Sequence, residues 1–328
     1  MIKLKGIYSE RAYTTWPSYQ LVYEWENIMS EKIGIPIKKI GTSKRILYSI
    51  IKKLKIQLPY FNILNKLNRP RGYYLYHVMT ASNPYMLSFN NNVIPIIIDF
   101  FLKKEDLVLF YKRFENCKCL LVSSLEVVDF LTENKCPISF FHFPISLPDL
   151  YKFKKYEKKY QILLAGRQNI LLKEYLNKYL GEFPETEFVY ESETEKFIYI
   201  SNKFGLIGNF SKREDFIKLL RLSKVFFYTT PGMDEGANRT NGFNQVTPKY
   251  LELLAANVKI IARYPNNKEA DYYELNKVCQ NIENYEQFRQ VLSEYLKNSN
   301  SNYLVQKILE KHYTSNRIEL LNNILAAL

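Results

Sequence analysis

Glycine, proline and long hydrophobic runs are all scarce in this chain. Only 11 Gly and 13 Pro occur among its 328 residues, while 47% of the residues are hydrophobic. This composition excludes a disordered or low-complexity chain and favours a globular one, with about two domains for this length. No run of 18 apolar residues occurs, and the opening MIKLKGIYSERAY lacks the apolar core of a signal peptide. We therefore expect no spanning helix and no secretory leader.

Metal-binding patterns are also missing. The three histidines (His77, His142 and His312) lie far apart in the sequence, and the four cysteines (Cys117, Cys119, Cys136 and Cys279) form no CxxC pair. No Asp-x-Asp occurs either. These absences predict no bound metal and no cofactor. They also favour buried free thiols, as in a reducing cytoplasm.

Acidic residues are absent from one long stretch. Between Lys32 and Ile98 there are eleven Lys or Arg and no Asp or Glu, in a chain whose net charge is +13. Such a block implies an anionic partner, either nucleic acid or a membrane surface. Within it, residues 38–58 predict a basic amphipathic helix whose apolar stripe is Ile46, Leu47, Ile50, Ile51 and Leu54. We expect it to contact an anionic membrane surface; the alternative is a helix docked on its own domain with solvated lysines.

Short apolar runs alternate with amphipathic stretches along the chain, as in a doubly wound α/β sheet. The predicted strands are Leu75–Thr80, Pro95–Phe100 (with Pro95 at its start), Cys119–Ser123, Ile138–Pro144, Gln161–Ala165, Phe188–Tyr190, Leu206–Gly208, Val225–Tyr228 and Val258–Ala262. The predicted helices are Tyr19–Glu31, Ser124–Glu133, Ile170–Leu180, Ser211–Leu220, Pro248–Ala256 and those of the last 50 residues. A charged linker at 146–160 separates a first domain, 1–150, from a second, 151–305, and a final helix follows at 306–328.

The stretch from Val225 to Pro265 combines a strand, a glycine-rich loop, a helix and a second strand. Thr247-Pro248 predicts the N-cap and first residue of the helix, and Asn257 a left-handed cap at its end. A loop at a helix N-terminus attracts phosphate, and Arg239 and Lys249 add positive charge. Glu252, about one turn into the helix, suits a sugar diol. The alternative is an ordinary βαβ unit whose glycines only make turns.

The segment NRTNGFNQVTPKYLELLAANVKIIARYP resembles the donor-nucleotide segment of the group 1 glycosyltransferases, which have the GT-B fold. Their pattern has two glutamates eight positions apart. Glu252 matches the second, which in the family holds the ribose of the nucleotide, whereas the first falls on Asn244, a departure. Gly166-Arg167 at a strand end, with Lys173 six residues on, resembles the Arg/Lys pair that neutralises the donor diphosphate; the alternative is that Lys173 lies on an exposed helix face.

The resemblance implies a set of donor-binding residues and a fold. The set is Gly166, Arg167, Lys173, Arg239, Thr240, Gly242, Asn244, Thr247, Lys249 and Glu252. The fold is two Rossmann-like domains facing a cleft, the first binding the acceptor and the second the donor, with the C-terminal helix crossing back to the first. Many of these bacterial enzymes build capsule or O-antigen polysaccharide. The implied activity is a metal-independent, hexosyl-type transfer from a nucleotide-diphosphate sugar to a glycan or lipid-linked acceptor.

Two residues are candidates for catalysis. Asp99 ends its predicted strand, so its carboxylate is expected near the ligand crevice of a doubly wound sheet. An inverting transferase needs a base there, whereas a retaining one does not, and a helix cap is the alternative role. Arg239 is expected to stabilise the charge on the leaving diphosphate. Asp234 and Glu235, in the same glycine-rich loop, contact the donor sugar or are solvated.

Other activities fit parts of the sequence. A nucleotide-sugar epimerase shares the GT-B architecture, but a membrane-facing helix would be superfluous in it. A non-catalytic nucleic-acid-binding protein would use the basic block and the aromatic residues. However, the basic block does not include the phosphate-binding loop and no RNA-binding motif occurs, so we expect no nucleic-acid partner. The expected location is the cytoplasm, peripheral at the inner face of the cell membrane.

Overall fold

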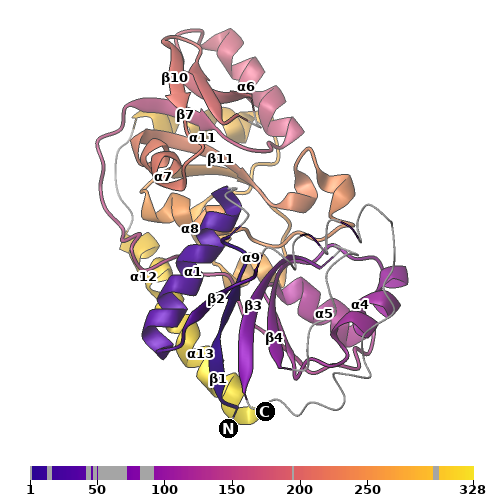
Figure 1. The fold of residues 1–328 in the computed structure, drawn as a ribbon. Coiled ribbons are helices and arrows are strands. Elements are labelled where there is room, and N and C mark those ends of the chain that lie inside the picture. The colour runs from indigo at the N-terminus through magenta and orange to yellow at the C-terminus, as the bar shows by residue number, and fades with distance from the viewer. Residues whose placement is uncertain are drawn as a thin grey trace. The chain divides into compact units, whose positions relative to one another are not determined.

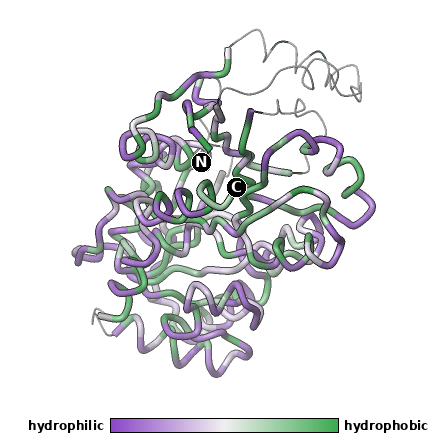
Figure 2. The backbone as a smooth tube through the Cα atoms, turned by 90° about the horizontal axis from the view of Figure 1, so that it is seen from below, coloured by the Kyte–Doolittle hydropathy of each residue, from purple (hydrophilic) through white to green (hydrophobic). Residues whose placement is uncertain are grey.

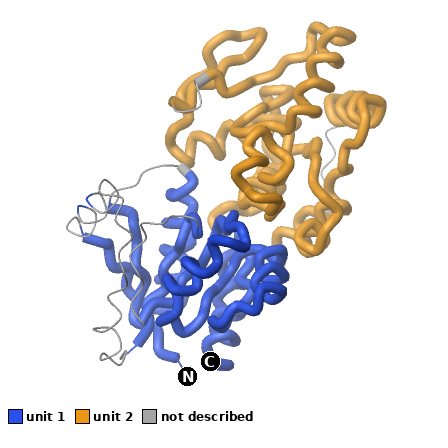
Figure 3. Tube along the Cα trace, turned by 90° about the vertical axis from the view of Figure 1, so that its right-hand side faces the viewer, with its two compact units in different colours: residues 1–148, 314–328 blue, residues 149–313 orange. Residues whose placement is uncertain are grey.

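The computed structural model describes residues 2–12, 17–41, 46, 50, 72–81, 92–193, 196–297 and 303–328. The chain divides into two compact units (Figure 3). Unit 1 comprises residues 1–148 together with 314–328, and unit 2 comprises residues 149–313. None of the described helices is long and apolar enough to cross a membrane.

Among its described residues, unit 1 forms a six-stranded sheet in which every neighbouring pair is parallel (Figure 1). In sheet order the strands are β2 (Ile37–Lys39), β1 (Leu4–Ser9), β3 (Tyr73–Thr80), β4 (Val93–Asp99), β5 (Leu120–Val122) and β6 (Phe140–His142). The interior strands are almost entirely buried and apolar, as expected for a parallel sheet covered on both faces.

The helices of unit 1 follow the same alternation. They are α1 (Pro17–Ile33), the short η1 (Lys104–Asp106), α4 (Leu107–Phe114), α5 (Leu125–Glu133) and α13 (Thr314–Ala327). In α1, Leu21, Val22 and Trp25 are buried, which is the predicted apolar face. The Trp25 indole Nε1 donates to Ser146 O (3.0 Å) and ties α1 to the end of the first 148 residues.

The last helix packs on unit 1 although it follows unit 2 in sequence. Figure 1 shows α13 beside α1. Thr314 N donates to Leu147 O (2.9 Å), and the Arg317 guanidinium donates to Pro144 O and Ile145 O (both 3.0 Å). The sequence placed Arg317 on an amphipathic helix, but its burial shows that it is a tether rather than a surface charge.

Unit 2 contains a six-stranded sheet within its described residues. In sheet order the strands are β10 (Gly205–Asn209), β9 (Ile198–Ser201), β8 (Phe188–Glu193), β7 (Tyr160–Leu164), β11 (Ser223–Thr229) and β12 (Lys259–Arg263). The four strands from β8 to β12 are parallel, whereas β9 and β10 add an antiparallel edge.

Helices flank the sheet of unit 2. They are α6 (Ile170–Glu182), α7 (Arg213–Leu222), η2 (Pro231–Met233), η3 (Ala237–Arg239), α8 (Pro248–Ala255), α9 (Lys268–Tyr272), α10 (Leu275–Val278), α11 (Tyr285–Lys297) and α12 (Tyr303–Lys311). Leu176 of α6 and Phe288 of α11 pack with Phe227 of β11 in one apolar core. The helical turns alternate between hydrophilic and hydrophobic residues in Figure 2, as amphipathic helices do.

The α/β prediction with two Rossmann-like sheets and a returning C-terminal helix is confirmed. The cleft between the domains stays a prediction. Three strands (β1, β2 and β9) were not predicted. Pro95 lies third in β4, opposite Tyr76, and not at the strand's start. The strand begins earlier because Val93 and Ile94 are buried between their neighbours, which outweighs one missing ladder bond.

Candidate functional site

The candidate site of unit 2 begins at the ends of two neighbouring parallel strands. β7 ends at Leu164 and runs into Ala165–Asn169, while β11 ends at Thr229 and runs through a long loop to α8. Because β7 and β11 pair directly, their carboxyl ends meet at one edge of the sheet. In doubly wound sheets this edge is where ligands bind.

Four contacts join the two loops. The Arg167 Nε donates to Asp234 Oδ2 (2.6 Å), and Lys173 Nζ pairs with Glu235 Oε1 (2.7 Å). Asn169 Nδ2 donates to Met233 O (2.6 Å), and Glu235 N donates to Gln168 O (3.0 Å). Asn169 also accepts from Leu172 N as the N-cap of α6. The clamp fixes both loops as one surface.

Two arginines meet over one glycine of this surface. A Cβ atom added to Gly236 would lie 2.6 Å from Arg239 Nε and 3.1 Å from Arg167 Cδ, so both side chains cross the space that glycine leaves open. Arg239 is exposed, and the Arg167 side chain keeps 46% of its surface exposed although its Nε is bound. In the part of the chain that the structure describes, no carboxylate pairs with Arg239.

Helix α8 begins beside these arginines. Thr247 is its N-cap residue and Pro248 its first residue, as predicted, although the Thr247 side chain makes no capping bond. Gly166 has φ +71° and donates its N–H to Glu191 Oε2 (3.0 Å). A Cβ atom on Gly166 would lie 3.5 Å from Lys249 Nζ, so this turn rests against the lysine ammonium.

Lys249 lies below the loops rather than in open solvent. Its ammonium is 4.8 Å from the Phe216 ring centroid and 5.5 Å from that of Phe226. Burial lowers the pKa of Lys249, and the charges of Glu252 and Glu191 oppose this effect. The result is a positive charge enclosed behind the site.

Glu252 is buried in α8, with its Oε1 2.8 Å from Arg213 Nη1. Its side chain is 4% exposed. The Arg213 guanidinium in turn lies over the Tyr151 ring, 5.2 Å from the centroid. The predicted ribose ligand is therefore already held by an arginine, which the sequence did not indicate.

The remaining predicted loop residues shape the backbone. Asn244 accepts from Thr230 Oγ1 (2.9 Å) and donates to Gly242 O (2.9 Å). Thr240 is buried, and its Oγ1 donates to Ala237 O (2.9 Å). Gly242 has φ +88°, a left-handed conformation that favours glycine. These side chains brace the turn instead of facing outward.

Asp99 belongs to unit 1, at the carboxyl end of β4 and opposite Thr80. It lies close enough to Tyr19 of α1 to contribute, after burial and the charge of Glu10, to a pKa of about 12 for that tyrosine. The side chain is half-buried at the edge predicted for it. The structure thus places Asp99 and Arg239 in different units.

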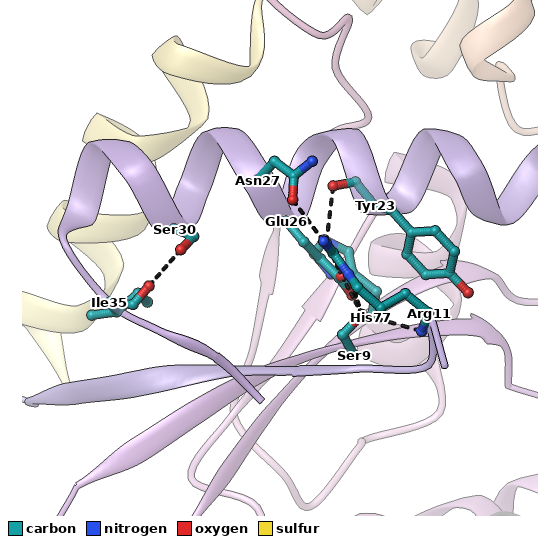
Figure 4. A network of polar contacts seen from close by, with 8 residues as sticks. All are labelled: Ser9, Arg11, Tyr23, Glu26, Asn27, Ser30, Ile35 and His77. Carbon is teal, nitrogen blue, oxygen red and sulfur yellow. Dashed lines mark hydrogen bonds and ion pairs between the residues drawn. The ribbon is translucent and has the colours of Figure 1, made fainter. Parts of the chain in front are cut away.

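A second cluster of ionisable residues lies in unit 1 (Figure 4). Glu26 Oε2 accepts from Ser9 Oγ (2.5 Å) and from Arg11 Nη2 (2.8 Å). His77 Nδ1 is 3.9 Å from Glu26 Oε1. Burial raises the pKa of Glu26 and lowers that of His77 to about 3, so the imidazole is neutral. This closed cluster stabilises the fold and offers no exposed group to a ligand.

The predicted helix at residues 38–58 lies almost wholly outside the described residues. At its start, Lys38 Nζ donates to Tyr74 OH (2.7 Å), and the side chains of Ile46 and Ile50 are exposed. Among the described residues, no three His, Cys, Asp or Glu side chains gather as metal ligands would. All four cysteines are free, and burial raises the pKa of the Cys119 thiol to about 12.

Sequence reasoning missed several contributors to the site. Asn169 had a signal, since it precedes a predicted helix as N-caps do. Asp234 was noted as a loop residue, but not as the partner of Arg167. Glu191 and Arg213 had no local signal, because each reaches the site from another element of the sheet.

No protein-family model and no curated protein sequence matches this chain. Solved structures are similar to it at low identity. One is the pneumococcal O-GlcNAc transferase GtfA in complex with UDP and GlcNAc (11% identity, TM-score 0.45, 86% of this chain and 59% of that chain). Others are S. aureus TarM in complex with UDP (12%, 0.49, 77% and 55%) and S. aureus MnaA with UDP (12%, 0.46, 99% and 96%).

The chain thus spans less than two thirds of the length of GtfA and TarM. At these identities a shared fold does not establish a shared activity, because one fold hosts many functions. Function has to follow from the residues of the site.

Proposed function

We propose that this protein is a glycosyltransferase that uses a nucleoside-diphosphate sugar, with the donor nucleotide bound to unit 2. The observation that carries the proposal is the meeting of Arg167 and Arg239 over Gly236, beside the N-terminus of α8. Two guanidinium groups at a helix N-terminus suit a diphosphate, since both the side chains and the backbone N–H groups attract it. The resemblance of this segment to group 1 glycosyltransferases supports the same assignment.

In this proposal the arginines act most strongly on the transition state. The acceptor oxygen attacks the anomeric carbon while the bond from that carbon to the diphosphate breaks. The bonding electron pair leaves with the nucleoside diphosphate, and Arg167 and Arg239 stabilise its growing negative charge. Lys249 adds a positive field from behind the loops. No metal is required for this step.

Glu252 is proposed to hold the ribose. Its Oε1 already contacts Arg213, so a ribose hydroxyl would donate to Oε2. The ion pair keeps the carboxylate charged and fixed in place, which prepares it as an acceptor. For an inverting transfer, Asp99 of unit 1 takes the proton of the acceptor hydroxyl.

The finer role is a proposal as well. We infer hexosyl transfer to a glycan or lipid-linked acceptor in capsule or O-antigen type synthesis, at the cytoplasmic face of the cell membrane. The basic block between Lys32 and Ile98 supports an acceptor anchored in an anionic leaflet.

A thermal-shift screen tests the proposal. Uridine, adenosine, guanosine and cytidine diphosphates are compared with a single-stranded oligonucleotide, with and without EDTA. UDP, present in the GtfA, TarM and MnaA structures, is the first probe. At a hundred times its Kd, a bound nucleotide adds about 2.7 kcal/mol of stability. Stabilisation by the oligonucleotide alone, or a nucleotide effect abolished by EDTA, contradicts the proposal. Transfer of sugar to an added acceptor separates a transferase from an epimerase.

A further inference from the structure

Asp234 is a buried carboxylate in the middle of a positively charged site. Its side chain is 5% exposed, and both oxygens are engaged. Oδ1 accepts from Gly236 N (2.6 Å) and Oδ2 accepts from Arg167 Nε (2.6 Å). The loop backbone therefore holds the carboxylate, and the carboxylate holds the arginine.

The bond to Arg167 uses only one edge of the guanidinium. A guanidinium carries five N–H donors, and Nε supplies one of them. In the described part of the chain, Arg167 makes no other side-chain bond, and 46% of its side chain is exposed. Its Nη1 and Nη2 groups are thus presented together, which is the arrangement for bidentate binding of a phosphate.

The neighbouring residue shows a different kind of ion pair. Glu235 contacts Lys173 Nζ, but the side chains are 40% and 52% exposed. Two mobile, solvated side chains with one contact fix little orientation. Asp234 and Glu235 carry the same charge in the same loop, and only Asp234 is anchored.

We propose that Asp234 is a positioning residue, which orients the Arg167 guanidinium toward the donor diphosphate. This inference rests on the proposed function. Charge alone predicts the reverse role, since a carboxylate beside a diphosphate site repels the ligand. Removing the carboxylate therefore weakens binding if Asp234 acts by orientation, and strengthens binding if it acts only by charge. The sign of the effect separates the two.

The experiment compares Asp234→Asn with Glu235→Gln in the full chain. Asn has nearly the same shape, but its single oxygen can accept from Gly236 N or from Arg167 Nε and not from both. We expect Asp234→Asn to raise the Kd for the tightest-binding nucleoside diphosphate about tenfold to a hundredfold, the range for a lost charged hydrogen bond. Glu235→Gln removes the same charge, and its Kd is expected to stay level or fall.

Kinetics give a readout that loosening of the loop would not. An arginine oriented for the transition state predicts a fall in kcat in Asp234→Asn, whereas loss of uniform binding raises KM with kcat unchanged. Unchanged or tighter nucleotide binding in Asp234→Asn overturns the inference, as does a rise in KM alone. A wild-type protein that binds no nucleoside diphosphate overturns the proposed function first, and the inference falls with it.

Arg167→Lys keeps the test decisive if Asp234→Asn does not fold. Arg167 is partly exposed, so this variant should retain the fold, which circular dichroism checks. It keeps the positive charge but has no Nε–H and no planar fork. A loss of nucleotide affinity similar to that expected for Asp234→Asn supports orientation, and wild-type affinity overturns it.

Discussion

Each unit contains a buried glutamate paired with an arginine, and the two pairs have the same length. Glu26 and Arg11 lie 2.8 Å apart in unit 1, and Glu252 and Arg213 lie 2.8 Å apart in unit 2. Around Glu26 the other groups are Ser9 and a neutral His77, and the cluster is complete in itself (Figure 4). Around Glu252 the positive charges continue through Lys249 to the exposed Arg167.

The difference shows how a structural cluster is told from a binding site. A buried charge needs its partner and its hydrogen bonds whether or not it has a function. What distinguishes unit 2 is cationic nitrogen that remains exposed after its own carboxylates are satisfied. Unit 1 stores its charges inside the fold, while unit 2 leaves donors for a ligand.

The largest effect should come from the exposed arginines of unit 2. Arg239→Ala, and likewise Arg167→Ala, should lower kcat by about 10²–10³-fold, or about 2.7–4 kcal/mol, the range for one donor to a developing charge. The donor KM should rise less, because the contact strengthens in the transition state. Steady-state kinetics with Lys218→Ala, an exposed pair on α7, as control measures this. Normal turnover in both arginine variants would place the diphosphate elsewhere.

Glu26→Ala should break the cluster of unit 1 and leave the site of unit 2 intact. We expect unit 1 to lose about 2–3 kcal/mol of stability, somewhat below the range for fully buried pairs because the Arg11 side chain is 21% exposed. Both tryptophans, Trp16 and Trp25, belong to the sequence of unit 1, so their fluorescence in urea follows its unfolding. Nucleotide Kd is the control. A large change in that Kd would show that the cluster serves the donor site.

Glu252→Gln sharpens the same comparison, because it changes the matching glutamate in unit 2. The amide still accepts a bond from Arg213, but it loses the charge proposed to hold the ribose. Donor-nucleotide affinity should fall by about 1–3 kcal/mol, the range for hydrogen bonds to a charged group. Isothermal calorimetry on this variant and on Glu26→Gln measures the contrast. Equal affinities in wild type and Glu252→Gln would remove Glu252 from the site.

These pairings also mark the limit of what the sequence could predict. Strands such as β4 and β11, and helix α8 with Thr247-Pro248 before it and Asn257 (φ +51°) after it, follow from local patterns. The unpredicted β1, LKGIYS, alternates charge, glycine and apolar residues, so its strand character depends on pairing with β3. Periodicity cannot detect such pairing.

For the site, the sequence placed Arg167 and Arg239 near a phosphate-binding loop, and the structure brings them together. It could not show that Asp234, 67 positions from Arg167, holds that arginine. Nor could it show that Glu252 is buried against Arg213. Ion pairs between separate elements depend on tertiary packing, and no local spacing encodes them.

His77 allows a smaller test of the closed cluster, through pH. Its pKa in the folded protein is about 3, below the usual value of 6.5, because burial disfavours the charged form. Below pH 6.5 the unfolded chain binds a proton that the folded one does not, so stability falls with pH, by up to about 1.4 kcal/mol per pH unit. His77→Leu should show a flatter slope between pH 6.5 and 5. Glu26 and His142 titrate in both proteins, so identical slopes would contradict a buried neutral His77.

The last contrast between the two halves is their surface charge. Eleven Lys or Arg without a single Asp or Glu lie between Lys32 and Ile98. Near an anionic leaflet each of them contributes about 1 kcal/mol, screened over a Debye length of about 8 Å at physiological salt. We therefore expect wild-type protein to co-sediment with vesicles that contain anionic lipid, and to dissociate as salt rises.

Reversal of Lys52, Lys53 and Lys55 to Glu should abolish that binding, since it removes three attractive charges and adds three repulsive ones. The matched control reverses Lys152, Lys154 and Lys155, three exposed lysines of unit 2 with similar spacing. A partner surface confined to the first half predicts that the control triple retains most of its vesicle binding, and that both triples keep wild-type nucleotide affinity. Equal binding to neutral and anionic vesicles, binding to neither, or equal loss in both triples would mean that the lysines of residues 38–58 are a solvated face and the excess charge acts only as net charge.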